Sequence, residues 1–260
     1  MKYIVYFVIA FGATTVGSMT GMGGGVVIKP LLDVLHDFDV ETIGGLSAIT
    51  VFSMAVVSIG KQMLAKTKIP FAQGIPLAVG SVLGGLWGQN MLELVVRVFR
   101  VQEQILVIQN VLLGILIFFV WLYMRKKDRI QGRHLSGIPV SIFTGCFLGL
   151  SSSFLGIGGG PVNVALLTYL YSMSTKTAAV CSLITILSSQ AAKLLTMAAA
   201  SGFGRLDLSM APVMVIGAVA GGYTGTVCSR KLSEKEVEKA FHMVQLGVLG
   251  TAIFNVIRNL

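Results

Sequence analysis

Four polar residues stand out within the apolar segment 177–200. Ser182, Thr185, Ser189 and Lys193 are spaced three, four and four residues apart, which places them on one stripe of a helix. A charged residue inside a membrane segment is rare and indicates a functional site. A row of hydroxyls that ends in a cation favours a site or path for an anion. The alternative is that each hydroxyl bonds its own backbone or a neighbouring helix.

A second lysine follows a cluster of glycines near the start of the chain. Residues 20–29 read TGMGGGVVIK, and the next apolar run carries Ser47, Thr50 and Ser58 on one stripe. Lys29 is therefore a further candidate anion contact. Its alternative role is that of a long side chain that reaches the membrane interface.

The glycine cluster occurs twice, as TGMGGG at 20–25 and LGIGGG at 155–160. Consecutive glycines do not line one helix face, but they let the backbone bend and let a ligand approach it closely. A segment that can be helical follows each cluster, led by Pro161 in the second copy. Such helix N-termini expose free N–H groups and a positive dipole end, so two of them predict an anion site. A nucleotide site is excluded, because no strand precedes the clusters and no P-loop Lys-Ser/Thr follows them.

The residues expected to bind the substrate come from these clusters and stripes. They are Gly23, Gly24, Gly25, Lys29, Ser47, Thr50, Gly158, Gly159, Gly160, Asn163, Ser182, Thr185, Ser189 and Lys193. The three cysteines and three histidines are scattered, so no metal site, cofactor or catalytic residue is expected. Asp33, Asp37, Asp39 and Glu41 are expected near one surface, and no carboxylate is expected at the centre of a full span.

The composition predicts that lipid, not water, surrounds these elements. Of 260 residues, 54% are hydrophobic and 12% are charged, whereas a soluble domain has about a quarter charged residues. The net charge of +9 arises in short loops such as 125–134. That pattern is typical of the cytoplasmic loops of membrane proteins, so nucleic-acid binding is not expected.

The apolar runs predict an all-α polytopic membrane protein. Six runs have roughly the 20 residues that span a bilayer: 44–60, 70–88, 104–124, 177–200, 208–228 and 240–257. The glycine clusters are flanked by 3–19 and 26–36, and by 138–155 and 161–172. The second piece of each pair is too short to span alone and is expected to be a half-helix or re-entrant element. Residues 3–19 are expected to form the first membrane segment rather than a signal peptide.

Matches at an offset of about 135 residues predict an internal duplication. Repeat one is 1–128, repeat two is 136–260, and a basic linker lies at about 125–135 in one transporter domain. An inverted arrangement puts 13 Lys and Arg inside and 5 outside, whereas a parallel arrangement gives 11 and 7. The positive-inside rule favours inversion. A second matched glycine set, GSVLGGLWG at 80–88 and GAVAGGYTG at 217–225, indicates close helix packing.

The paired motifs GMGGGVVIKPLL and GIGGGPVNVALL, each followed by a Ser/Thr-rich segment, resemble the TauE/SafE family of sulfite and sulfonate exporters, also called the toluene-sulfonate uptake permease family. The likeness covers 1–260. The family's glycines fall on 23–25 and 158–160 and its proline on Pro30, but Ala165 stands where that proline would be mirrored. The resemblance implies transport of small sulfur-containing anions across a bacterial inner membrane.

The expected function is therefore transport, in the direction of export, of sulfite or an organosulfonate by alternating access. Enzymatic activity is not expected. The alternatives are a carrier of another small solute or a metal cation, and a membrane assembly or sensor subunit without flux. The expected partners are the lipid bilayer and the anion, and a homodimer is left open.

Overall fold

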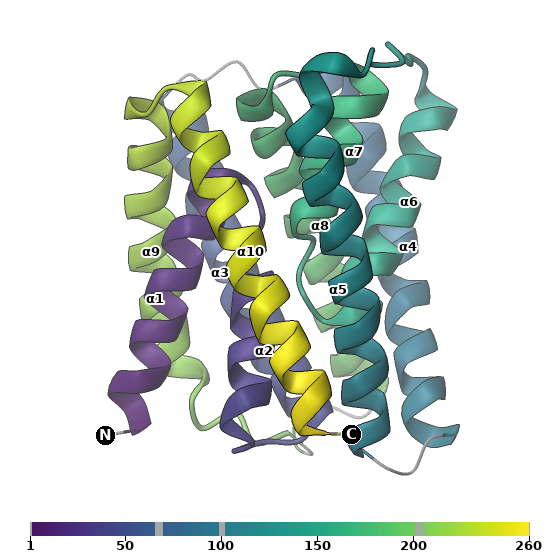
Figure 1. Cartoon of the computed structure of the whole chain (residues 1–260). Helices are drawn as coiled ribbons and strands as arrows, with labels where there is room; N and C mark the ends of the chain where they lie inside the picture. Colours follow the sequence, from purple (N-terminus) through teal and green to yellow (C-terminus); the bar gives the residue numbers. More distant parts are fainter. Residues whose placement is uncertain (1, 66–69, 99–101, 201–203, 205, 260) are drawn as a thin grey trace.

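The chain folds into a bundle of helices in the computed structural model, which describes residues 2–65, 70–98, 102–200, 204 and 206–259 (Figure 1). The α-helices of these residues are α1 (Lys2–Thr20), α2 (Gly25–Leu35), α3 (Val40–Leu64), α4 (Phe71–Val98), α5 (Gln102–Lys126), α6 (Ile138–Leu155), α7 (Pro161–Tyr171), α8 (Thr175–Ala200), α9 (Ala211–Lys231) and α10 (Glu234–Arg258). A short 3-10 helix, Lys127–Arg129, follows α5. The described residues contain no strand, so the predicted all-α class is confirmed.

Eight of these helices are long and apolar enough to cross a membrane: α1, α3, α4, α5, α6, α8, α9 and α10. Large apolar side chains such as Phe143, Leu195 and Ile257 are exposed on the outside of the bundle. Lys29 and Lys193, by contrast, are among the largest fully buried side chains. Apolar groups outside and charged groups inside are the distribution expected of a polytopic protein in lipid.

The observed helices overlap every predicted apolar run, although the run 208–228 begins three residues before α9 and several helices extend beyond their runs. The run 70–88, for example, continues as α4 to Val98. Polar caps explain two of the starting points. The Asp39 carboxylate accepts a hydrogen bond from the Thr42 N–H at the start of α3, and a capping box of Ser233 and Glu236 starts α10.

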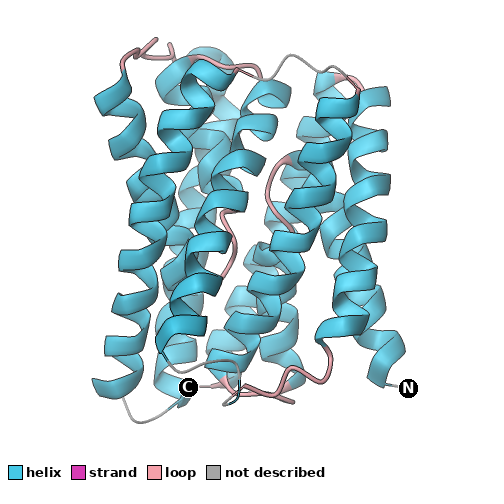
Figure 2. Ribbon diagram, turned by 180° about the vertical axis from the view of Figure 1, so that it is seen from behind, coloured by secondary structure: helices cyan, strands magenta, loops and turns pink. Residues whose placement is uncertain are grey.

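The two short helices begin inside the bundle. Helices α1 and α2 are joined by a loop at mid-height, and their outer ends lie at the end of the bundle that holds both chain termini (Figure 1). Helices α6 and α7 are also joined at mid-height, and their outer ends lie at the opposite end; Figure 2 shows both loops between the helices. The prediction of helix pairs broken at the glycine clusters is therefore confirmed.

The second glycine set brings helices into very close contact. Helix α4 packs along α6, and α1 packs along α9. A Cβ atom on Gly84 would lie 1.9 Å from the Cys146 carbonyl oxygen, and one on Gly225 would lie 2.0 Å from the Thr15 carbonyl oxygen. Any side chain there would force the helices apart, which confirms the predicted packing role.

Candidate functional site

The two glycine loops meet in the middle of the bundle. A Cβ atom on Gly23 would lie 2.7 Å from the Gly158 carbonyl oxygen, and one on Gly25 would lie 2.3 Å from the Ile157 carbonyl oxygen. Gly23, Gly24, Gly158, Gly159 and Gly160 all have positive φ angles. Glycine is required here because other L-residues rarely adopt this backbone and because side chains would separate the loops.

The start of each short helix lies at this meeting point. The N-cap residues are Gly24 for α2 and Gly160 for α7, and neither provides a side-chain hydrogen bond to its helix. Pro161 occupies the first turn of α7, as predicted. The positive ends of two helix dipoles, without capping side chains, therefore lie at mid-height of the bundle.

Most of the predicted hydroxyls bond the backbone. Ser182 Oγ donates to the Gly21 carbonyl at 2.7 Å, and Thr185 Oγ1 donates to the Ser182 carbonyl at 2.8 Å. The hydroxyls of Ser189 and Thr50 donate to carbonyls of their own helices, those of Ile186 and Leu46. The protons of these hydroxyls are thus engaged, and only their lone pairs remain to interact with other groups.

Asn163 joins this group from the first turn of α7. Its Nδ2 donates to Thr185 Oγ1 at 3.0 Å. Together with the bond from Ser182 to Gly21, this contact fixes α8 against both glycine loops. These residues hold the loops in place.

Lys193 is different, because its amine is buried and has no hydrogen-bond partner in the described part of the chain. Its side chain is 1% exposed, and Nζ forms no hydrogen bond with any described residue. Cβ atoms built on Gly44 of α3 and Gly156 after α6 would lie 3.5 and 3.8 Å from this Nζ. The ammonium therefore lies where α3, α8 and the end of α6 converge.

Two buried serines near the same point also lack partners. Ser47 lies three residues after Gly44 on α3, and Ser153 lies three residues before Gly156. Neither hydroxyl forms a hydrogen bond within the described part of the chain. Ser47 and Ser153 thus each lie three residues from a glycine that borders Lys193 Nζ. We call Lys193, Ser47 and Ser153 the lysine cluster.

Lys29 is also buried, but it is paired. Its Nζ lies 3.1 Å from Asp33 Oδ2, and the two side chains are 2% and 1% exposed. Asn110 of α5 donates to the same carboxylate oxygen at 3.3 Å, and Asn255 of α10 donates to the Pro30 carbonyl at 3.1 Å. Lys29 therefore does not extend to the interface.

This pairing corrects one prediction. Asp33 was expected near a surface, but it lies inside the bundle because the 11-residue α2 packs against α10 and because Asn110 of α5 reaches its carboxylate. Asp37 does lie at the surface, where hydrogen bonds from Lys2 and Tyr6 hold the pKa of its carboxyl below the usual range. Only Asp33 of the acidic cluster contributes to the interior.

The two lysines approach the same glycine. A Cβ atom on Gly156 would lie 3.1 Å from both Cδ and Cε of Lys29 and 3.8 Å from Lys193 Nζ. The structure thus brings Lys29 and Lys193 of the predicted set together around Gly156, and Ser47 lies three residues from Gly44, which also borders Lys193. Asn163, Ser182 and Thr185 lie instead along the glycine loops.

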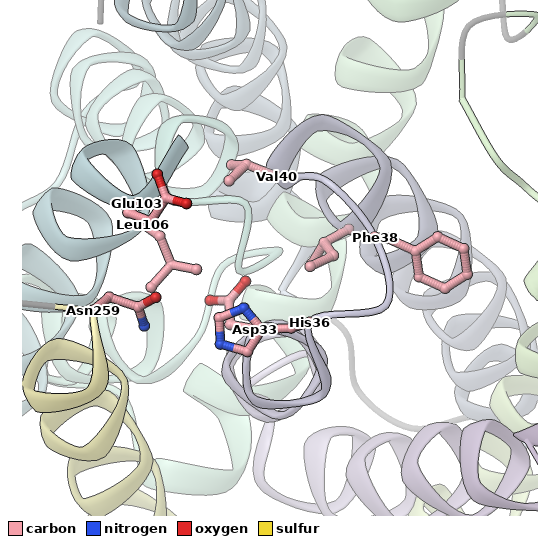
Figure 3. A pocket seen from close by; sticks show the side chains of 8 residues that line it. Asp33, His36, Phe38, Val40, Glu103, Leu106 and Asn259 are labelled. Atoms are coloured by element: carbon pink, nitrogen blue, oxygen red, sulfur yellow. The ribbon is translucent and has the colours of Figure 1, made fainter. Parts of the chain in front are cut away.

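A small pocket leads to Asp33 from the end of the bundle that holds the termini. Its volume is about 60 Å³, and its lining residues are Asp33, His36, Phe38, Val40, Ile43, Glu103, Leu106 and Asn259. Figure 3 shows His36 beside Asp33, with Glu103 and Asn259 on the other side. A volume of this size is enough for water.

The sequence contained evidence for the residues that were missed. Asp33 follows Lys29 by four residues, the spacing of an ion pair on a helix. Asn110 and Asn255 are amides inside apolar runs, which is unusual in a membrane span. Within the described residues, no group of three or more His, Cys, Asp or Glu side chains could hold a metal ion.

Comparison with known proteins places this arrangement in a family. Residues 6–252 match the family model described as sulfite exporter TauE/SafE. The chain belongs to the TauE/SafE family. It is 25% identical over 260 residues to a "probable membrane transporter protein" of Methanocaldococcus jannaschii, covering 94% of this chain and 92% of the relative. It is 24% identical over 272 residues to the probable membrane transporter protein YunE of Bacillus subtilis, covering 94% of each.

No solved structure matches the chain. The family and these relatives identify it as a membrane transporter of the TauE/SafE family, as the motifs predicted. Together with the eight candidate spans, they confirm the predicted location as a multi-pass protein of the bacterial inner membrane.

Proposed function

We propose that this TauE/SafE transporter exports a small sulfur-containing anion, such as sulfite or an organosulfonate. The observation that supports an anion as the substrate is Lys193, a fully buried lysine whose Nζ has no partner among the described residues. An uncompensated charge in an apolar interior is costly, and a bound anion removes that cost. The same charge opposes a metal cation. Sulfur and export come from the description of the family alone.

The anion lies at the lysine cluster. Lys193, Ser47 and Ser153 offer an ammonium and two hydroxyls to its oxygens, and charge-assisted hydrogen bonds are the stronger kind. Lys29 borders the site across Gly156. The backbone of Gly23–Gly25 and Gly158–Gly160 provides the positive ends of two helix dipoles. The glycine loops are held in place by a set of polar side chains: Thr50, Asn163, Ser182, Thr185 and Ser189.

Transport follows from alternating access between two inverted repeats, residues 1–128 and 136–260. Reciprocal packing supports the repeats: α1 contacts α9 as α6 contacts α4, and α2 contacts α10 as α7 contacts α5. Val51 and Ile186, which are 135 residues apart, cover the glycine loops in the same way. The opposite directions of the two helix pairs in Figure 1 support the inversion.

Flux measurements on Lys193→Met test the site. The purified protein is reconstituted in liposomes, and sulfite and methanesulfonate uptake are followed. Because a hydrogen bond to a charged group contributes roughly 1.5–3 kcal/mol, we expect the variant to lose at least about tenfold in apparent affinity. Lys235→Met, at an exposed position at the start of α10, is the matched control and should transport normally. Unchanged flux in an inserted, monodisperse Lys193→Met protein would refute the assignment.

A thermal-shift screen separates anion from cation transport without any need for flux. Sulfonates and sulfite should raise the unfolding temperature of the solubilised protein, as any ligand of the folded state does. Divalent metal cations should not. Stabilisation by a cation alone would contradict the proposal.

A further inference from the structure

Three charged side chains are fully buried in the part of the chain that the structure describes: Lys29, Asp33 and Lys193. Both carboxylate oxygens of Asp33 face Lys29. Lys29 Nζ lies 3.4 Å from Oδ1 and 3.1 Å from Oδ2. The charge of Lys29 is thus balanced inside the protein. The charge of a protonated Lys193 is not balanced by any described residue.

The other groups around Asp33 do not change this balance in the interior. Asn110 from α5 donates an uncharged amide hydrogen bond to Asp33. His36, Glu103 and Asn259 line the small pocket on the side of the bundle end. His36 and Glu103 are exposed there, so water screens their charges. When Lys193 is protonated, the described residues around Gly156 therefore carry one uncompensated positive charge.

We propose that Asp33 determines the charge of the substrate: by neutralising Lys29 it leaves Lys193 as the single uncompensated cation buried among the described residues, and the site therefore selects monovalent over divalent anions. This inference rests on the proposed function and deepens it. A monovalent anion brings the buried charge to zero. A divalent anion would leave one negative charge in the apolar interior, which is costly.

Methanesulfonate and sulfate are a suitable pair of probes, because they share the sulfur–oxygen chemistry and differ mainly in charge. The wild-type protein should transport methanesulfonate and should discriminate against sulfate by about a hundredfold or more, the low end of the cost of an unpaired buried charge. Asp33→Asn keeps the shape of the side chain and frees Lys29. We expect this variant to shift the ratio of sulfate to methanesulfonate uptake by about tenfold or more towards sulfate.

A second-site rescue tests the same idea in a protein with the wild-type balance of buried charge. Lys193→Met removes the uncompensated cation and should lower the apparent affinity for methanesulfonate at least about tenfold, so that uptake at low substrate concentration falls with it. In Lys193→Met/Asp33→Asn the unpaired cation is Lys29, which borders the same glycine. Methanesulfonate uptake should rise clearly above that of Lys193→Met, by about threefold or more at low substrate concentration, because the interior again carries one positive charge. Lys29→Met/Asp33→Asn, which removes the internal pair and keeps Lys193, should retain the monovalent preference.

Two results would overturn the inference: an unchanged selectivity ratio in folded Asp33→Asn, or no rescue of Lys193→Met by Asp33→Asn. If Asp33→Asn does not fold, the rescue experiment alone decides. Failure of the proposed function has a different signature, since the wild-type protein would then transport and bind neither anion. Size-exclusion profiles of each variant separate loss of folding from loss of transport.

Discussion

At the scale of single residues, Gly156 connects the two buried lysines. It has a φ of +68°, and the space where its Cβ atom would lie is bordered by Cδ and Cε of Lys29 and by Nζ of Lys193. Its backbone conformation and its lack of a side chain are both needed, since either change would move a lysine. The position of the anion in our proposal therefore depends on a residue that never contributes a charge.

We predict that Gly156→Ala reduces both stability and transport. The left-handed backbone costs an alanine roughly 1–2 kcal/mol, and the new methyl group would press on Lys29 from 3.1 Å. The unfolding temperature in detergent and the sulfonate flux should both fall. Gly250→Ala in α10 is the control, because nothing lies within 4 Å of its Cβ position. That variant should be as stable as the wild-type protein or slightly more so. Equal behaviour of the two variants would contradict the role given to Gly156.

At the scale of elements, length and hydrophobicity were sufficient to predict the long helices and the two short ones. The glycine clusters also predicted the breaks at Gly23 and Gly158, because consecutive glycines cannot continue a helix without cost. The burial of Asp33 could not be predicted in this way. It depends on α10 and Asn110 covering α2, residues far away in the sequence. The hydrogen-bond partners of the hydroxyls could not be predicted either. Their spacing along a helix does not show which of them donate to backbone carbonyls.

The contact between α4 and α6 gives a prediction at this scale. In Gly84→Ala the new methyl carbon would lie 1.9 Å from the Cys146 carbonyl oxygen. The helices must separate, and overpacking of this kind typically costs about 1–3 kcal/mol. We expect a lower unfolding temperature than for Gly60→Ala in α3, where a Cβ atom meets nothing within 4 Å. A Gly84→Ala protein as stable as Gly60→Ala would show that α4 and α6 are less closely packed.

At the scale of the whole molecule, the two ends of the bundle differ in charge. The segment 127–137 and the connection from α9 to α10 lie at the end opposite the termini (Figure 1). The sequence 125–134 alone carries five Lys and Arg. The positive-inside rule predicts that this end faces the cytoplasm and that both termini face outwards. In that orientation, the pocket at Asp33 opens to the outside.

Cysteine labelling tests this orientation. In a protein whose Cys146, Cys181 and Cys228 are replaced by alanine, single cysteines are introduced as Gln131→Cys and Asp207→Cys. Both positions are exposed and lie in connections between helices, 131 between α5 and α6 and 207 between α8 and α9. A membrane-impermeant maleimide added to intact cells should label the cysteine at 207 and not the one at 131, whereas permeabilised cells should label both. The reverse pattern would place the termini inside. The outer ends of α1 and α2 would then lie on the cytoplasmic side, and those of α6 and α7 on the outside. Labelling at both positions in intact cells would indicate leakage, which a cytoplasmic marker protein with an exposed cysteine detects in the same sample.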